Sequence, residues 1–314
     1  MERREGWQCW ASIMVLALAV ATSAWVPGIV AQQFGSTFPK VFATETPSSF
    51  QNFDSEFSVY WGPENVQTTD SGQMLDLLLT NASGAGFGSK RAYLFGRINM
   101  NLKLISGDSS GTVTTYYLSS SGDKHDELDF EFLGNQTGQP YLLQTNVFAS
   151  GVGDREQRIF LWFDPSADFH SYSVLWTENL IIFEVDGIPI RIFRNNEAMG
   201  LPYLNAQPMN VYSSLWNGDT WATEGGRIKV NWTYAPFVAT FQNYNYDACE
   251  WTGDGTPPCA EVSSMNWWEA AEYQTLSDSQ YNELMKVQET YMVYDYCTDN
   301  TRWNTTPPEC ATNL

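Results

Sequence analysis

The stretch His125 to Asn135 restricts the fold of this chain more than any other segment. Charged side chains at positions 125, 127, 129 and 131 alternate with a mostly apolar set, so an extended strand carries the two sets on opposite faces. Aligned like charges repel each other, and an apolar face has to be buried. We therefore predict a strand over Leu128 to Leu133 that lies inside a sheet with both of its faces occupied.

Three carboxylates, those of Glu127, Asp129 and Glu131, share one face of this predicted strand. Carboxylates in one cleft acquire different pKa values, and this separation provides a proton donor and a base. We therefore interpret the three as catalytic. An acidic surface strand and a calcium site are the alternatives, although a strand does not wrap oxygens around an ion as a loop does.

Short strands separated by Gly, Asn, Asp and Ser turns extend from residue 50 to residue 234, without the alternation of strands and helices that parallel sheets need. About a dozen strands at this spacing predict an all-β, two-sheet antiparallel sandwich. The clearest hairpin turns at Asp186 and Gly187. The predicted strands are Phe57 to Trp61, Gln73 to Leu79, Tyr93 to Leu104, Thr112 to Ser119, Leu128 to Leu133, Tyr141 to Val147, Arg158 to Phe163, His170 to Thr177, Leu180 to Val185, Ile188 to Phe193, Met209 to Ser214 and Arg227 to Thr233.

The pattern changes after Pro236. Ser277 and Gln280 have the spacing of a capping box, and apolar residues follow at helical spacing as far as Tyr291. A strand-like segment from Tyr291 to Tyr296 follows this predicted helix. We expect residues 32–240 to form the main domain and residues 241–314 to form an extension of the same domain.

Residues 1–31 have the features of an export signal. Arg3 and Arg4 precede an apolar segment over 11–24, and cleavage is predicted near residue 24 or residue 31. An uncleaved anchor is the alternative, but this apolar segment is too short and too early for a convincing membrane span, and no later apolar stretch is long enough to form one. We therefore expect a soluble, secreted protein.

The cysteines agree with export. Cys9 lies in the predicted signal, and the other four of the five cysteines suffice for two disulfides. Sequential pairing, Cys249 with Cys259 and Cys297 with Cys310, is the simplest of three connectivities. A zinc site is the alternative, but no Cys-x-x-Cys motif or nearby His supports it, so no metal is expected. Possible glycosylation sites are Asn81, Asn135, Asn231 and Asn304.

Charge and aromatic content narrow the class of partner. A formal net charge of −20 disfavours nucleic acid and anionic membranes, which bind basic surfaces. Aromatic residues make up 15% of the chain, and flat aromatic faces are good platforms for sugar rings. A neutral substrate is therefore favoured.

Residues 125–135 closely resemble the active-site signature of the xyloglucan endotransglucosylase/hydrolases. This family is the plant cell-wall branch of the laminarinase-like glycoside hydrolases, which are β-jelly rolls of two curved antiparallel sheets. The resemblance covers essentially the whole mature chain, in order, with a short C-terminal helix and strand. It continues through residues 107–113, 143–148, 155–158, 161–165, 185–191, 213–217, 221–223, 294–299 and 307–310.

The resemblance implies a role for each carboxylate. It assigns Glu127 as the nucleophile, Glu131 as the general acid and then base, and Asp129 as the residue that assists the nucleophile, with no cofactor. The family retains anomeric configuration, a choice that the spacing alone leaves open. Asn135 matches the family's glycan site. Further matches to substrate-binding positions are Gln144, Thr145, Asn146, Asp154, Arg155, Glu156, Trp216, Thr220, Trp221, Gly225 and Arg302.

The expected function is endotransglucosylation in the cell wall or apoplast, with xyloglucan as donor and a xyloglucan chain or oligosaccharide as acceptor. A xyloglucan hydrolase or related β-glucanase is the alternative, and a non-catalytic glucan-binding protein is a third reading. The segment from Trp216 to Trp221 is short, which favours transfer, because hydrolytic members tend to have a longer loop there. Thr220 and Glu224 occupy positions where members of the family commonly have Asp and Arg. These differences bear on the contacts of the loop and on which acceptor the protein prefers. No nucleic acid or membrane partner is expected, and the protein is expected to be a monomer.

Overall fold

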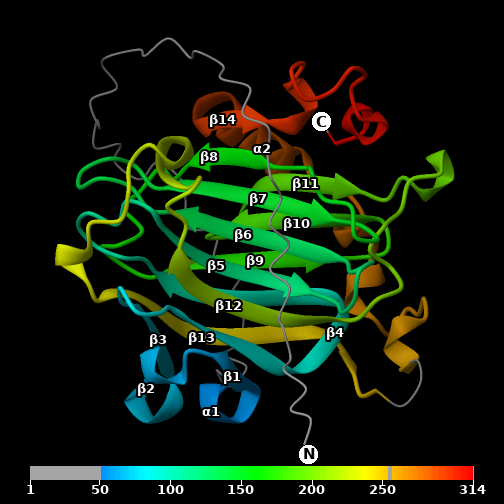
Figure 1. Ribbon diagram of the computed structural model, residues 1–314. Coiled ribbons are helices and arrows are strands. Elements are labelled where there is room, and N and C mark those ends of the chain that lie inside the picture. Colours follow the sequence, from blue (N-terminus) through cyan, green and yellow to red (C-terminus); the bar gives the residue numbers. More distant parts are fainter. Residues whose placement is uncertain (1–50, 254–256, 314) are drawn as a thin grey trace, which may run out of the picture. The chain divides into compact units, whose positions relative to one another are not determined.

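The computed structural model describes residues 51–253 and 257–313 (Figure 1). The export signal predicted over residues 1–31 lies outside them. Antiparallel strands dominate, which confirms the all-β prediction, and none of the described helices is long and apolar enough to cross a membrane. The elements are α1 (Phe53–Glu56), β1 (Phe57–Trp61), β2 (Val66–Thr69), β3 (Met74–Leu79), β4 (Ala85–Lys103), β5 (Thr112–Ser119), β6 (Glu127–Leu133), β7 (Leu142–Phe148), β8 (Gln157–Phe160), β9 (His170–Trp176), β10 (Leu180–Val185), β11 (Ile188–Arg194), β12 (Met209–Asn217), β13 (Phe237–Trp251), α2 (Asp278–Tyr291) and β14 (Met292–Asp295), with short 3₁₀ turns between them.

One long strand, β4, belongs to both layers of the fold. Its first half pairs with β1 and β12, and its second half pairs with β9 and β13. Between the halves, Phe95 and Gly96 have positive φ angles of 65° and 109°, and a side chain at residue 96 would collide with Ala248 of β13. The first layer therefore runs β1-β4-β12-β5-β6-β7-β8-β14, and the second layer contains β13, β4, β9, β10 and β11 (Figure 1).

The two layers pack face to face through aromatic side chains. Phe132 of β6 lies 4.7 Å from Tyr172 of β9, measured between ring centroids. Leu128 and Phe130 of the same strand are fully buried. This packing confirms the prediction that the apolar face of β6 is covered, and it explains why the strand lies in the interior of a sandwich.

Phe130 offers a test of this core. Its ring lies 5.1 Å from that of Phe183 and 6.1 Å from that of Tyr172, both across the layers. Phe130→Ala should lower the free energy of unfolding by about 3–5 kcal/mol, because the layers cannot collapse onto the cavity that it leaves. Urea denaturation measures this change. Tyr281→Ala, at an exposed position of α2, should change the free energy by less than about 0.5 kcal/mol, and equal losses in both variants would contradict the account.

The C-terminal extension covers the outer face of the second layer. Its helix α2 has the predicted capping box between Ser277 and Gln280 and begins at Asp278, the residue after Ser277. Leu284 of α2 packs with Leu175, Leu180, Ile182 and Ile192. After the helix, β14 pairs with β8 and so lengthens the first layer. The predicted helix and the strand that follows it are thus both confirmed.

One predicted strand was wrong, and two strands and the start of a third were missed. Residues 227–233 form no strand, and the Asn231 side chain instead caps a 3₁₀ turn, Trp232–Tyr234. The strands β2 and β13 were missed, the latter because polar residues obscure its alternation. The start of β4 was missed as well, since the predicted strand began at Tyr93 and β4 begins at Ala85, in a segment with glycines at 84, 86 and 88. These glycines lie within or beside a strand because neighbouring groups occupy the space of a side chain.

Both predicted disulfides are confirmed. Cys249 is bonded to Cys259 and Cys297 is bonded to Cys310, with Cα separations of 5.5 Å and 5.6 Å. The domain boundary expected near residue 240 falls inside β13, so the segments before and after it contribute to one sheet. The division of the chain at that point stays a prediction.

Candidate active site

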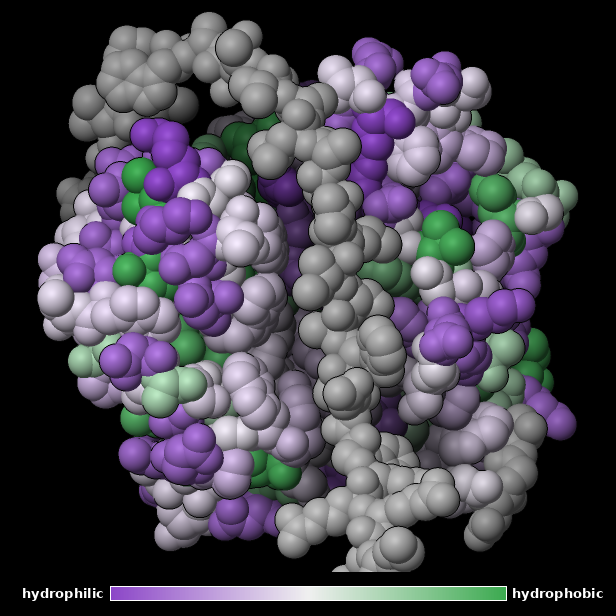
Figure 2. Space-filling model, viewed as in Figure 1, coloured by the Kyte–Doolittle hydropathy of each residue, from purple (hydrophilic) through white to green (hydrophobic). Residues whose placement is uncertain are grey.

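The acidic face of β6 lies on the side of the first layer that is opposite the aromatic core. In the register of the sheet, Asp129 stands opposite Tyr117 of β5 and Asn146 of β7. Glu131 stands opposite Gln144 of β7 in the same way. Since opposite residues of an antiparallel pair share a face, the carboxylates of β6 lie in rows that cross several strands. The strands that carry these rows run side by side in Figure 1, and Figure 2 shows a largely hydrophilic surface in the same view.

Burial and neighbouring charges favour the protonated form of Asp129. Its side chain is 6% exposed, and burial raises its pKa well above the ordinary value of a carboxyl group. The charges of Glu127 and Glu131 and a hydrogen bond with Glu127 raise the pKa further, whereas Arg191 opposes the shift. In its protonated form, Asp129 can donate the hydrogen bond that it shares with Glu127.

Among the three carboxylates on the acidic face of β6, Glu131 is the second with a displaced pKa. Burial raises its pKa to about 7, and the charges of Glu156 and Glu127 act in the same direction. A hydrogen bond from the Gln144 Nε2 group opposes the shift, as does the charge of Arg158. A carboxyl group with a pKa near 7 can both give and accept a proton at neutral pH.

Arg158 determines which end of the Gln144 amide faces Glu131. Its Nε group donates to Gln144 Oε1 at 2.7 Å, so the amide nitrogen points toward the carboxylate. Arg158 itself lies over the ring of Tyr294 of β14, 4.9 Å from its centroid. Arg158 was not among the residues predicted from the sequence, because its contact with Gln144 depends on the pairing of β7 with β8.

Two tyrosines beside the carboxylates were also missed. Tyr117 and Tyr212 stand opposite each other on β5 and β12, and their rings stack at 5.3 Å. Tyr60 of β1 contacts Tyr212 edge to face at 5.9 Å. The only feature of the sequence that points to these tyrosines is their alternating position within predicted strands. Alternation does not show which strands become neighbours.

The structure places several predicted substrate-binding residues away from the carboxylates. Thr145 stands opposite the buried Phe130, and its hydroxyl accepts a hydrogen bond from Arg191 at 3.0 Å. Arg155 is buried and pairs with Glu309 at 2.7 Å. Both side chains therefore support the fold rather than face the carboxylates.

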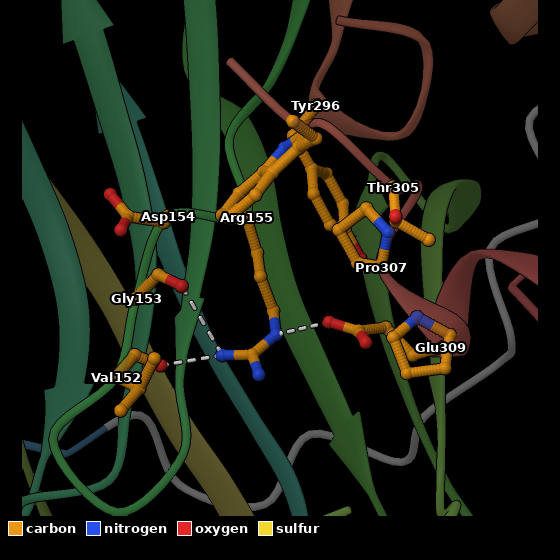
Figure 3. Close-up of a pocket in the computed structure, with 10 residues that line it drawn as sticks. Val152, Gly153, Asp154, Arg155, Tyr296, Thr305, Pro307 and Glu309 are labelled. Carbon is orange, nitrogen blue, oxygen red and sulfur yellow. Dashed lines mark hydrogen bonds and ion pairs between the residues drawn. The ribbon is translucent and has the colours of Figure 1, made fainter. Parts of the chain in front are cut away.

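Figure 3 shows how Arg155 holds the turn after β7 against the C-terminal tail. Its guanidinium donates to the carbonyl groups of Val152 and Gly153 and to the carboxylate of Glu309. A pocket of about 300 Å³ lies between this turn and the tail. Asp154 lines the pocket and has a positive φ of 65°, which turns its side chain away from that of Arg155.

The remaining predicted residues lie in two groups. Arg302 of the tail contacts the carboxylates of Asp154 and Glu156, the second at 2.5 Å. Trp216 and Trp221 lie 6.0 Å apart and pack on a small apolar cluster at Leu133, the end of β6. The loop with the exposed residues Thr220 and Gly225 follows β12. It is held by Thr223, which forms hydrogen bonds with the backbone of Gly111 and Gly134.

Of the glycosylation sites, Asn81, Asn231 and Asn304 are exposed and Asn135 is partly exposed, and their occupancy stays a prediction.

The pKa of Glu131 predicts the pH dependence of any reaction that needs its proton. The protonated fraction falls as the pH rises above about 7. The value of kcat/KM should therefore decline above that pH by about tenfold per unit. A pH–rate profile measured between neutral and alkaline pH tests this, and a constant rate across that range would contradict a role for the Glu131 proton.

Two family models match the chain. Glycosyl hydrolases family 16 matches residues 53–234, and the xyloglucan endo-transglycosylase C-terminus matches residues 262–310. A probable xyloglucan endotransglucosylase/hydrolase protein 7 from Arabidopsis thaliana is 49% identical over 263 residues, which cover 83% of this chain and 89% of that protein. The chain belongs to the xyloglucan endotransglucosylase/hydrolase family. Xyloglucan endotransglucosylase protein 2 from Diospyros kaki is likewise 49% identical, over 82% of this chain and 87% of the relative.

Solved structures of other glycoside hydrolases share the fold of this family member. A β-glucanase from Bacillus licheniformis superimposes with a TM-score of 0.51 at 24% identity, over 63% of this chain and 94% of that structure. A laminarinase catalytic domain from Thermotoga petrophila has a TM-score of 0.52 at 16% identity, over 63% and 96%. These similarities support the jelly-roll arrangement of the two layers.

Proposed function

We propose that this protein is a xyloglucan endotransglucosylase, which cleaves the β-1,4-glucan backbone and transfers the released segment to another xyloglucan chain. The observation that carries the proposal is the arrangement on β6. Asp129 shares a hydrogen bond with Glu127 and has a raised pKa, and Glu131 on the same face has a pKa of about 7. One ionised and one protonated carboxyl group on either side of a glycosidic bond are what a double displacement requires.

In the first step, an oxygen of Glu127 attacks the anomeric carbon of the donor, and the bond from this carbon to the bridging oxygen breaks. Glu131 gives its proton to the bridging oxygen, which leaves as a hydroxyl group of the departing chain. In the second step, the ionised Glu131 takes a proton from the acceptor hydroxyl, whose oxygen attacks the same carbon and releases Glu127. Two displacements at one carbon retain its configuration.

Asp129 assists Glu127 in both steps. Its hydrogen bond orients the Glu127 carboxylate toward the anomeric carbon and stabilises the carboxylate when the glycosyl group leaves. Gln144, oriented by Arg158, holds Glu131 in a fixed position through a hydrogen bond. We assign Asn146, Glu156, Trp216, Trp221 and Arg302 to substrate binding, because they lie on the strand face or loops around the carboxylates.

Transfer and hydrolysis share the first step and differ in whether sugar or water completes the second. The names of the relatives include endotransglucosylases, and the loop after β12 is tight, with hydrogen bonds from Trp221 and Ala222 back to Gly218. These observations favour transfer. Hydrolysis by the same residues is the second candidate.

Incubation with xyloglucan and fluorescently labelled xyloglucan oligosaccharides separates the two. Transfer moves the label into polymer, which size-exclusion chromatography detects, without an equal rise in reducing ends. A rise in reducing ends without labelled polymer would show that the protein is a hydrolase. A binding protein without activity would give neither signal.

We also propose that the protein acts in the cell wall after export and cleavage near residue 24 or residue 31. Its two disulfides and the plant origin of its relatives support an extracellular site of action. N-terminal sequencing of the secreted protein measures the cleavage position, and light scattering measures whether it is the expected monomer.

A further inference from the structure

Three tyrosine rings line the face of the first layer beyond the carboxylates. Tyr60 of β1 is 52% exposed and meets Tyr212 of β12 edge to face at 5.9 Å. Tyr212 stacks in turn on Tyr117 of β5 at 5.3 Å. These three residues, which we call the tyrosine row, extend from the outer strand of the layer to the strand beside β6.

The tyrosine row depends on two glycines of β4, the strand that lies between β1 and β12. A Cβ atom at Gly86 would lie 2.5 Å from the hydroxyl oxygen of Tyr60, and one at Gly88 would lie 2.7 Å from the ring of Tyr212. Real Cβ atoms do not approach other atoms so closely. The rings of Tyr60 and Tyr212 therefore occupy the space that side chains of β4 would otherwise fill.

The register of β5 and β6 places the row beside the carboxylates, and a hydrogen bond links two members of the row. Tyr117 stands opposite Asp129, and its hydroxyl is hydrogen-bonded to that of Tyr60. Burial raises the pKa of Tyr117, and its neighbours Tyr60, Glu127 and Asp129 act in the same direction. Tyr117 therefore stays neutral, and the row presents uncharged rings and hydroxyl groups to a substrate.

We propose that Tyr60 is a residue that determines donor specificity, by stacking against a sugar ring of the glucan donor several units from the bond that is cleaved. This inference rests on the proposed function. The apolar face of a pyranose stacks on an exposed aromatic ring, and Tyr60 is the most exposed residue of the row. The C-terminal tail with Arg302 lies at the opposite end of the layer, where we place the acceptor.

The distance between Tyr60 and β6 sets the expected behaviour. Its ring lies over β4, which is three strands from β6, or roughly 14 Å at the usual strand spacing. Only a donor long enough to cover this distance can contact it. Binding energy from such a remote unit can be used to position the reacting bond, so its loss lowers the rate for long donors and leaves short donors unaffected.

A series of donor oligosaccharides of increasing length tests the inference. For the longest donors, Tyr60→Ala should lower kcat/KM about tenfold, whereas for the shortest it should match the wild type. Tyr60→Phe keeps the ring and should stay close to the wild type at every length. Tyr281→Ala, which removes an exposed tyrosine from α2, is the matched control and should change none of the values.

The outcomes are distinct. An equal loss at all donor lengths in both Tyr60 variants would mean that Tyr60 acts only through the hydroxyl of Tyr117, and this would overturn the inference. Unchanged rates in Tyr60→Ala would overturn it as well. Wild-type enzyme without turnover on any glucan would refute the proposed function itself, whereas wild-type turnover with no length-dependent loss would refute the role of Tyr60 alone.

Discussion

Glu127→Ala should abolish both transfer and hydrolysis, with a loss in kcat/KM of at least about 10⁴-fold. The carboxylate of Glu127 forms the covalent bond in the proposed mechanism, and alanine offers no group that replaces it. Water would have to attack the anomeric carbon without the positioned nucleophile. Transfer of donor segments to labelled oligosaccharides and release of reducing ends, measured on the same samples, report the two activities.

Asp129→Asn is the matched comparison for this variant. An asparagine amide can still donate a hydrogen bond to Glu127, as the protonated Asp129 does, so it should retain far more activity than Glu127→Ala. Equal thermal denaturation of the variants would show that the fold is intact. Turnover that survives in Glu127→Ala would exclude Glu127 as the nucleophile.

Glu131→Gln should lower kcat/KM on xyloglucan by about 10²–10⁴-fold, because glutamine cannot give a proton to the leaving oxygen. A donor with an activated aryl leaving group needs no such proton, so its first step should lose much less. The decline in rate above pH 7 should also disappear, since the titrating group is gone. Rates on both donors across the pH range measure these effects.

Glu156→Gln provides the control for the pH effect. The charge of Glu156 raises the pKa of Glu131, so its removal should lower that pKa and move the alkaline decline to a lower pH. Glu131 itself remains, and the decline therefore persists. A profile that is identical in wild type and Glu131→Gln would show that another group supplies the proton.

Local patterns predicted the parts of the fold that depend on neighbouring residues. The alternation over β6 identified both its acidic face and its buried face with Phe130, and the Asp186-Gly187 turn identified the hairpin of β10 and β11. The capping box at Ser277 identified α2 in the same way. Each of these signals acts over only a few residues, so the sequence displays it directly.

The parts that were missed depend on contacts between distant segments. Gly86 and Gly88 lie near the start of β4, and glycines favour turns, but here the rings of Tyr60 and Tyr212 occupy the space beside them. The resemblance to the family likewise selected Thr145 and Arg155 without showing that one faces the core and the other binds the tail. Only the register of the strands and the position of the tail reveal these roles.

The most direct test of the account is to identify the residue that becomes glycosylated. A donor with fluorine at C2 of the reacting sugar and a good leaving group slows the second displacement, so the covalent intermediate of a retaining enzyme accumulates. Proteolysis and mass spectrometry should then place the donor segment on Glu127. A modified residue elsewhere, or turnover that inverts the anomeric configuration without any covalent species, would contradict the account.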